Sequence, residues 1–419
     1  MTKRVPILFL MLAAAAGAQT YTWQQQGAKM LDGTAYGYFG QASALSADGN
    51  TAMVGGPGFS SQTGRTWVLI RTAGVWSMQA GPMSYTTSVA SQSQGSSVAL
   101  SADGNTALVG GPMYGSGAGN VFVWTRSGTT WSQQASLTCT TGCDGHNTKF
   151  GTSVSLSNDG NTAIIGGPYD NSQVGGAWVW TRSGSTWTQQ AKLLGTGASS
   201  QAYQGTSVSI SGDGNTAVVG ANGNNSYVGC FWAWTRSGVS WTQKAGPLVA
   251  SDYSTQPYQG SSISISNDGG TVAVGGRNDN SGAGAVWIWK LTAGTWAQQG
   301  TKLVGSGGDS ASYQGLSVSL SSDGNSLEVG GNGDASNQGA VWFWTRSGVT
   351  WAQKGSKFVG TGAVGGQSRQ GTSVAISQDG KTAMEGGWYD GSTAAIGAVW
   401  FLNSTLAAAS NTRRVILVN

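Results

Sequence analysis

Side chains that could take part in catalysis or metal binding are few in this chain and lie far apart. The single histidine, His146, follows Asp144 in a segment that also contains Cys139 and Cys143. A Ser-His-Asp triad or a multi-histidine metal site would depend on this one residue, and we interpret His146 as a solvated loop residue. Four aspartates stand at similar places in the sequence: Asp170, Asp279, Asp334 and Asp390.

These four aspartates allow two interpretations. If folding brought two of them together, the paired carboxylates would provide the general acid and base of a polysaccharide hydrolase or lyase. If each lay in its own turn, its carboxylate would hydrogen-bond the neighbouring backbone. We favour the turn interpretation, so no catalytic residue is predicted.

A repeated segment sets the positions of these residues, and its clearest copy, at 204–221, reads QGTSVSISGDGNTAVVGA. Its Asp-Gly pair recurs at intervals of 54 to 56 residues by subtraction, which indicates seven units of a repeat architecture. The aspartates of these pairs are Asp48, Asp103, Asp159, Asp213, Asp268, Asp323 and Asp379. Each pair supplies the positive φ that a tight β-hairpin requires.

Each unit is predicted to contain four antiparallel strands. In the fourth unit they are 205–211, 216–221, 230–236 and 241–245. The turns that join the first strand to the second and the third to the fourth are short and nearly constant between units, whereas the other two connections are longer and vary. An up-and-down blade places the constant turns at one end and the varying loops at the other. We therefore expect a uniform rim and a variable rim, with binding on the variable rim.

Tryptophans mark the third and fourth strands, which hold 18 of the 19 in the chain. Pairs such as Trp232 and Trp234 lie on one side of a strand and are predicted to pack against the next blade. The seventh unit lacks a fourth strand after Trp400, whereas segment 23–30, WQQQGAKM, matches segment 296–303, WAQQGTKL. We predict an all-β, seven-bladed β-propeller of four-stranded blades, in which the N-terminal strand closes the last blade and leaves no open edge.

A Phe-Gly pair followed by a Gly-Gly-Pro triplet occurs in two units. Phe39-Gly40 precedes GGP at 55–57, and Phe150-Gly151 precedes GGP at 166–168. Other units keep GGP at 110–112, or have Gln-Gly in place of Phe-Gly at 94–95, 204–205, 259–260, 314–315 and 370–371. The pattern resembles the FG-GAP repeat of the integrin α-subunit propeller and of many secreted bacterial proteins. The resemblance covers nearly the whole mature chain, and it implies a seven-bladed propeller that acts in binding or adhesion.

The chain departs from this family in the loops that bind calcium. Calcium-binding members carry several carboxylates around the Asp-Gly pair. Here the turn at Asp159 reads SNDGNTA, with Ser157 and Ala163 where acidic ligands would be expected. One carboxylate is too few for a hard cation, so we predict neither a metal nor a cofactor.

The three cysteines suggest one short disulfide. Cys139 and Cys143 share a loop and would form a local bridge in an oxidising compartment, which leaves Cys230 as a buried thiol. A zinc site in this loop would lack a fourth ligand.

Residues 1–18 have the pattern of a secretory signal peptide. Lys3 and Arg4 precede an apolar run at 5–16, which is too short to span a membrane, and no later stretch could span one. We expect an exported, monomeric propeller at 19–405, secreted or at the cell surface, followed by a tail at 406–419. Because the basic residues are scattered and the formal charge is only +4, nucleic acid is not expected as a partner.

One tryptophan, Trp388, falls outside the repeated positions and stands beside Tyr389 and Asp390 in a variable loop. Tyr114 and Tyr169 lie in other loops of the same rim. These five residues are the candidate ligand-binding set, because exposed aromatic side chains often anchor ligands. The preferred hypothesis is a non-catalytic binding or adhesion module that docks an extracellular protein or glycan. The alternatives are an extracellular polysaccharide hydrolase or lyase, and a purely architectural surface protein.

Overall fold

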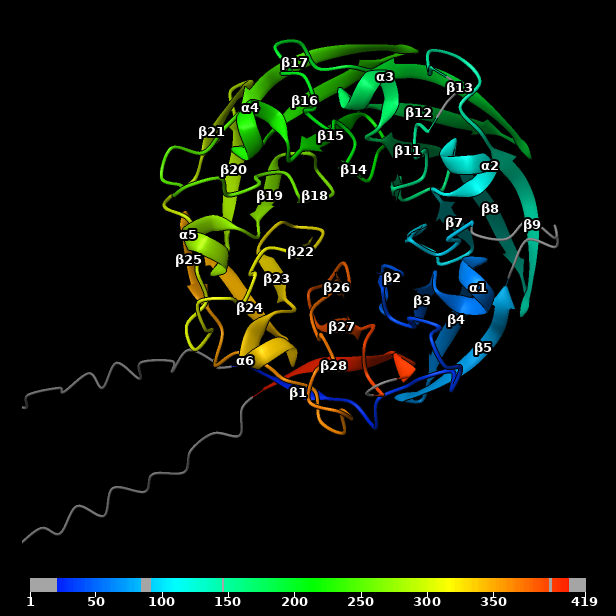
Figure 1. Ribbon diagram of the computed structural model, residues 1–419, viewed down its shortest axis with the longest axis vertical. Helices are drawn as coiled ribbons and strands as arrows, with labels where there is room; N and C mark the ends of the chain where they lie inside the picture. Colours follow the sequence, from blue (N-terminus) through cyan, green and yellow to red (C-terminus); the bar gives the residue numbers. More distant parts are fainter. Residues whose placement is uncertain (1–20, 84–91, 145–146, 392–393, 407–419) are drawn as a thin grey trace, which may run out of the picture.

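The repeats fold as seven four-stranded antiparallel sheets arranged in a ring (Figure 1). The computed structural model describes residues 21–83, 92–144, 147–391 and 394–406. The expected signal peptide and the chain after Leu406 lie outside the described residues. The all-β, seven-bladed propeller predicted from the sequence is confirmed.

The first two strands of each blade lie nearest the centre of the ring (Figure 1). The innermost strands, which are rich in Ser and Val, are β2 (Ala42–Leu45), β6 (Ser97–Leu100), β10 (Ser153–Leu156), β14 (Ser207–Ile210), β18 (Ser262–Ile265), β22 (Ser317–Leu320) and β26 (Ser373–Ile376). The second strands, which are mostly buried, are β3 (Thr51–Gly56), β7 (Thr106–Gly111), β11 (Thr162–Gly167), β15 (Thr216–Ala221), β19 (Thr271–Gly276), β23 (Ser326–Gly331) and β27 (Thr382–Gly387).

The outer two strands carry the repeated tryptophans. The third strands are β4 (Arg65–Thr72), β8 (Asn120–Ser127), β12 (Gly176–Ser183), β16 (Cys230–Ser237), β20 (Ala285–Thr292), β24 (Ala340–Ser347) and β28 (Ala398–Leu406). The outermost strands are β5 (Val75–Met83), β9 (Thr130–Leu137), β13 (Thr186–Leu193), β17 (Ser240–Leu248), β21 (Thr295–Gln298), β25 (Thr350–Gln353) and β1 (Tyr21–Gln25). We number the blades 1 to 7, from the blade that begins with β2 to the blade that begins with β26.

Blade 7 contains strands from both ends of the described chain. β1 pairs antiparallel with β28, with Trp23 opposite Ser404, and it forms the outer edge of the sheet that also contains β26 and β27. The Trp23 ring stacks on Phe343 of blade 6, with their centroids 4.0 Å apart. The predicted closure of the ring by the N-terminal strand is therefore confirmed.

The seams between blades form the core. Trp178, Trp232, Trp287, Trp342 and Trp400 are fully buried. One apolar cluster joins Leu108 of blade 2 to Trp178 of blade 3, and similar clusters occupy the other seams. Because each tryptophan buries a large apolar area, these seams hold the ring together.

Backbones meet at the motif glycines. A Cβ atom on Gly166 would lie 2.0 Å from the carbonyl oxygen of Gly205 in the next blade. Gly205 itself has a φ of +86°, which L side chains rarely adopt. The first glycine of the Gly-Gly pair and the glycine of the following Phe-Gly or Gln-Gly pair are thus needed for the blades to approach closely.

An arginine clamp ties five of the blades to the blade before them. In blade 2, Arg126 lies 5.4 Å above the Trp131 ring and donates to Gln79 Oε1 (3.1 Å) and Thr51 Oγ1 (3.3 Å) of blade 1. Its Nε donates to Asn105 Oδ1 at 2.9 Å. The equivalent arginines are Arg71, Arg182, Arg236 and Arg346. Each of these side chains crosses a seam near the uniform rim.

Candidate ligand-binding rim

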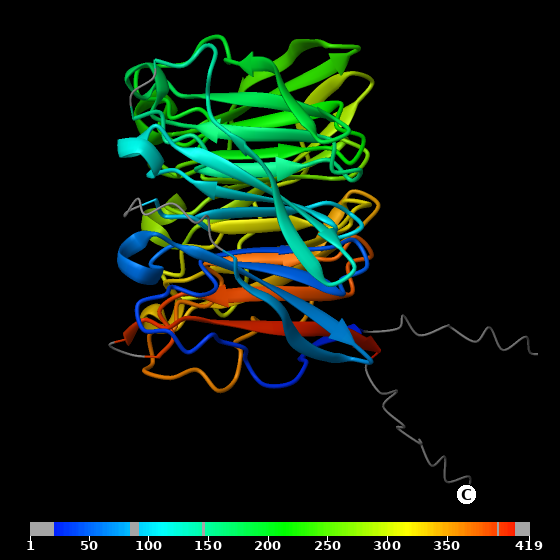
Figure 2. The same ribbon diagram turned by 90° about the vertical axis from the view of Figure 1, so that its right-hand side faces the viewer.

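The two rims of the ring differ as expected. In the side view the Asp-Gly hairpins gather on one side and the short helical turns on the other (Figure 2). These turns join the second and third strands of blades 1 to 6: α1 (Phe59–Gln62), α2 (Tyr114–Gly117), α3 (Asp170–Gln173), α4 (Asn224–Tyr227), α5 (Asp279–Gly282) and α6 (Asp334–Asn337). The middle residues of α5, Asn280 and Ser281, have left-handed φ of 50° and 58°. Asn tolerates this region better than most side chains, which fits the recurring Asn-Ser pairs in these loops.

The four loop aspartates of the variable rim are buried anchors. Asp279 is fully buried, and its Oδ2 lies 2.6 Å from Lys302 Nζ of the same blade. Its Oδ1 accepts a hydrogen bond from the backbone N–H of Ser254, at 2.7 Å, in the loop that arrives from blade 4. The equivalent ion pairs are Asp170 with Lys192, Asp334 with Lys357, and Asp390 with Lys29.

This geometry corrects the favoured interpretation of these aspartates. Their carboxylates bind a lysine and the backbone of the loop from the preceding blade, instead of capping their own turns. They are held in four separate blades, 3, 5, 6 and 7, so they do not form an acid–base pair either. Asp390 is 1% exposed, which makes it a support for the loop that carries Trp388.

Trp388 and Tyr389 form an aromatic cluster on this rim. Trp388 makes edge-to-face contacts with Tyr38 and Tyr389, with centroids 5.0 and 5.1 Å apart. The Arg369 guanidinium lies 5.8 Å from the Trp388 centroid. Both candidate residues are half-buried. The cluster therefore presents a fixed aromatic surface with a cation beside it.

The other two candidate tyrosines lie in different surroundings. Tyr114 packs edge-on against Phe122 and covers the end of the seam between blades 1 and 2. Tyr169 is 40% exposed and its ring lies 5.5 Å from that of Tyr203. Tyr169 is thus available to a ligand, whereas Tyr114 is partly committed to packing.

A cleft of about 350 Å³ opens on the same rim, over blades 5 and 6. Its lining consists of Tyr258, Arg277, Asn278, Tyr313, Leu316, Asn332 and Arg369. Among these described lining residues none is acidic, so Arg277 and Arg369 give the cleft a positive charge. Arg369 also contacts Trp388, and this joins the cleft to the aromatic cluster.

One residue from each blade stands in the same strained conformation around the channel mouth. Each of these residues directly precedes the Phe-Gly or Gln-Gly pair of its unit. Their φ angles all lie between 52° and 59°: Tyr38, Ser93, Lys149, Tyr203, Tyr258, Tyr313 and Arg369. Non-glycine residues seldom adopt this conformation. Its repetition places four tyrosines and two cations at equivalent positions of the blades, a feature that the recurring Tyr-Gln-Gly triplets only partly indicate.

The central channel is closed at the uniform rim. Residues 47, 102, 158, 212, 267, 322 and 378 form a closed circle in which each backbone N–H donates to the next carbonyl, at 2.9–3.1 Å. Inside the circle Asn158 Nδ2 donates to Asn267 Oδ1, and Gln378 Nε2 donates to Asn158 Oδ1. The cavity above has about 240 Å³ and no charged residue among its described lining. The channel is therefore a blind, neutral recess.

In the Asp-Gly turns, residues of the same turn donate hydrogen bonds to the aspartate carboxylate. Asp159 accepts hydrogen bonds from Ser157 Oγ, Asn161 N and Asn161 Nδ2. Burial alone would raise the pKa of Asp159, but these hydrogen bonds lower it below its ordinary value. Within the described parts of the chain, no three His, Cys, Asp or Glu residues gather in a way that could hold a metal ion.

Comparison with known families identifies the repeat. Residues 187–229 match the family model of the FG-GAP repeat. The chain carries an FG-GAP repeat. This match and the seven-bladed ring together fit the FG-GAP β-propeller family. No curated protein matches the sequence.

The Phe or Gln of each motif in this FG-GAP propeller supports a blade end. Phe150 is fully buried and packs edge-on against Trp178, with centroids 5.6 Å apart. At the Gln positions the side chain instead accepts a backbone N–H, as Gln259 Oε1 does from Ala250 at 2.9 Å. Both choices fix the loop that enters the blade.

The FG-GAP propeller also buries two glutamates that the sequence analysis did not single out. Glu328 in β23 and Glu385 in β27 are fully buried, and none of their carboxyl oxygens has a hydrogen-bond partner. Burial, and secondarily the charge of Glu385, raises the pKa of Glu328 well above its ordinary value. Burial raises the pKa of Glu385 to about 8, although the nearby Gly360 N–H lowers it somewhat. That N–H donates to Gln370 Oε1 at 2.5 Å.

The remaining candidates of the FG-GAP propeller are structural. Cys139 and Cys143 form the disulfide considered from the sequence, and Cys230 is a buried free thiol whose pKa burial raises. His146 lies outside the described residues. In the part of the chain that the structure describes, no helix has the length and apolar character needed to cross a membrane.

Proposed function

We propose that this FG-GAP propeller is an exported, non-catalytic binding module that docks a protein or glycan on its variable rim. The observation that carries the proposal is the cleft at the channel mouth, where Arg277 and Arg369 stand among tyrosines beside Trp388. Rigid aromatic side chains with a polar group supply contact area at low entropic cost. The positive charge of the cleft favours a ligand that bears acidic groups.

The rigidity of the rim supports this role. The buried aspartate–lysine pairs hold four of the variable loops against the loops of the preceding blades. A preorganised surface loses little conformational entropy when a ligand binds. The loops can differ in sequence while the blades beneath them stay constant.

The test is capture of ligands by the chain from residue 19 onward, on arrays of acidic and neutral glycans and of extracellular proteins. The double variant Trp388→Ala/Tyr389→Ala should bind a captured ligand at least about tenfold more weakly, with nearly unchanged thermal stability. Tyr253→Ala, which removes a 38% exposed tyrosine outside the cleft, is the matched control. Equal binding by the double variant and the parent would remove these residues from the site.

The alternative functions give different outcomes in the same experiment. A polysaccharide hydrolase or lyase would release shorter products from a bound glycan, and a purely architectural protein would show no saturable ligand. The buried, lysine-paired state of the loop aspartates speaks against the enzymatic alternative, because a general acid must reach its substrate.

A further inference from the structure

The seam between blades 6 and 7 lacks the arginine clamp. Arg346 of blade 6 pairs with Trp351, and the residue of blade 7 that pairs with Trp23 in the same register is Ser404. The seam between blades 4 and 5 also lacks the arginine, because Leu291, which pairs with Trp296 in this register, takes its position. Among the seven described seams, only the one between blades 6 and 7 has a short polar side chain at this position.

The partners of the clamp are replaced at this seam as well. Lys354 stands where Gln299 bonds Arg346, and Lys381 stands where Asn325 does so. The threonine position is taken by Ser326. The place that receives one guanidinium elsewhere is thus surrounded here by two ammonium groups and two hydroxyl groups.

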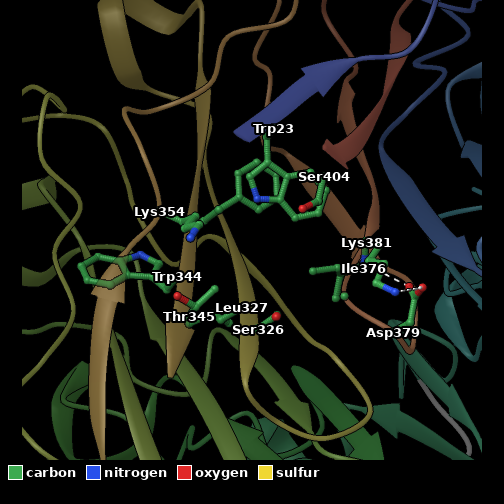
Figure 3. Close-up of a pocket in the computed structure, with 12 residues that line it drawn as sticks. Trp23, Ser326, Leu327, Trp344, Thr345, Lys354, Ile376, Asp379, Lys381 and Ser404 are labelled. Atoms are coloured by element: carbon green, nitrogen blue, oxygen red, sulfur yellow. Dashed lines mark hydrogen bonds and ion pairs between the residues drawn. The ribbon is translucent and has the colours of Figure 1, made fainter. Parts of the chain in front are cut away.

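A pocket of about 280 Å³ occupies the position of the missing arginine (Figure 3). Its polar lining includes Ser326, Thr345, Lys354, Asp379, Lys381 and Ser404, and its apolar lining includes Trp23, Leu327, Phe343, Trp344 and Ile376. In the close-up, Lys354 lies beside Trp23, whereas Lys381 lies at the other side of the pocket and is turned toward Asp379 (Figure 3). The pocket therefore combines positively charged side chains at its edge with an apolar floor.

The charges of the pocket favour an anion. Lys381 lies 3.9 Å from Asp379 Oδ2, but both side chains are more than half exposed, and such a pair holds its partners weakly. Lys354 adds a second positive charge on the other side, so a cation such as a guanidinium would be repelled. A carboxylate that enters the pocket would make charge-assisted hydrogen bonds to an ammonium group.

We propose that this pocket is a binding site for a small carboxylate with a ring-shaped body, of the size of a single uronic acid. The volume is large enough for one pyranose ring. Ring hydroxyls would meet Ser326 and Ser404, and the face of the ring would lie against Trp23. The site is on the uniform rim, opposite the cleft that carries the proposed docking function, and it does not depend on that function.

The test is titration of the folded chain with glucuronate, followed by NMR or calorimetry, with glucose and acetate as matched probes. Glucuronate should bind with an affinity on the order of millimolar, and glucose and acetate should bind at least about tenfold more weakly, since each lacks one half of the contacts. Equal binding of glucuronate and glucose would overturn the proposal, as would no binding of glucuronate.

A variant that restores the repeat provides the decisive control. Ser404→Arg with Lys354→Gln and Lys381→Asn rebuilds the clamp that five other seams have, so the chain should fold and glucuronate binding should be lost. Lys244→Gln, the same change at the seam between blades 4 and 5, should leave binding unchanged. Binding retained by the rebuilt clamp would contradict the proposal, and docking through the variable rim, measured with Trp388→Ala/Tyr389→Ala, would be unaffected either way.

Discussion

Glu328 and Glu385 lie on facing sheets of blades 6 and 7, and both side chains enter the same seam. Glu328 in β23 lies opposite Phe343 of β24, and Glu385 in β27 lies opposite Val374 of β26. Phe343 and Val374 belong to one apolar cluster of that seam. The equivalent positions of the other blades are apolar, for example Val218 and Val219 in blade 4.

The buried glutamates should make stability depend on pH. The folded-state pKa of Glu385 is about 8, above its ordinary value of 4.5, so the folded chain keeps a proton that the unfolded chain releases. The contribution of this group is complete below about pH 4.5 and is lost as the pH rises to about 8. Denaturant unfolding between these values should show a falling free energy of unfolding.

The variant Glu328→Met/Glu385→Val, which copies residues found at these positions in other blades, should remove this pH dependence. At pH 8 it should also be more stable than the parent, by about 1–4 kcal/mol, because well-packed apolar residues replace buried ionisable groups. A parent protein whose stability is flat between pH 4.5 and 8 would contradict the assignment.

The arginine clamp should contribute measurably to stability. Arg126→Ala removes hydrogen bonds to Gln79 and Thr51 and the contact with Trp131, and it should lower the free energy of unfolding by about 1–3 kcal/mol. Arg126→Lys keeps the charge but loses the planar fork, so an intermediate loss is expected. Urea titration measures both, and an Arg126→Ala protein as stable as the parent would show that the seam is held by apolar packing alone.

The buried loop aspartates should contribute more to the free energy of unfolding than the asparagine that takes their position in blade 4. Asp279→Ala leaves Lys302 without its partner and removes the acceptor for Ser254, at an expected loss of about 3 kcal/mol. In blade 4, Asn224 accepts from the backbone N–H of Ser199 at 2.8 Å, and Asn224→Ala should lose only about 1 kcal/mol. Thermal or urea unfolding compares the pair, and equal losses would contradict the importance of the buried charge.

The closing strand should be required for solubility. A chain that begins at residue 31 lacks β1 and exposes the edge of β28, as well as the Phe343 face that Trp23 covers. Exposed strand edges promote association, so size-exclusion chromatography should show aggregates. A synthetic peptide of residues 21–30 should reduce this aggregation, and a soluble, monomeric truncated chain would contradict the role of β1.

The periodic features of the fold could be read from the sequence because each has a local physical cause. The Asp-Gly pairs require one turn type, and the match of segment 23–30 to 296–303 shows which strand the seventh unit lacks. The aspartate anchors were missed because their partners lie on another strand. Units that have the loop aspartate, such as the one with Asp279, also have a lysine at the position of Lys302. Units that lack the aspartate lack this lysine as well. That covariation between units was an available signal.

Other features depend on three-dimensional neighbours. Glu328 and Glu385 are each the only charged residue of their strand, and only the ring places them in one seam. The pocket at Ser404 likewise follows from a register that joins the two ends of the chain. A residue that breaks the repeat therefore has to be considered together with its neighbours in the adjacent blade. Such residues indicate where this propeller differs from a uniform one.

The circle of backbone hydrogen bonds at the uniform rim has a consequence for how such rings evolve. Its circumference fits seven donors and seven acceptors, and Asn158, Asn267 and Gln378 brace it from three unequal directions. Duplication or loss of one unit would break this hoop and misalign the braces. The circle of hydrogen bonds is therefore compatible with seven blades only, and the three side chains that brace it fix the order of the units.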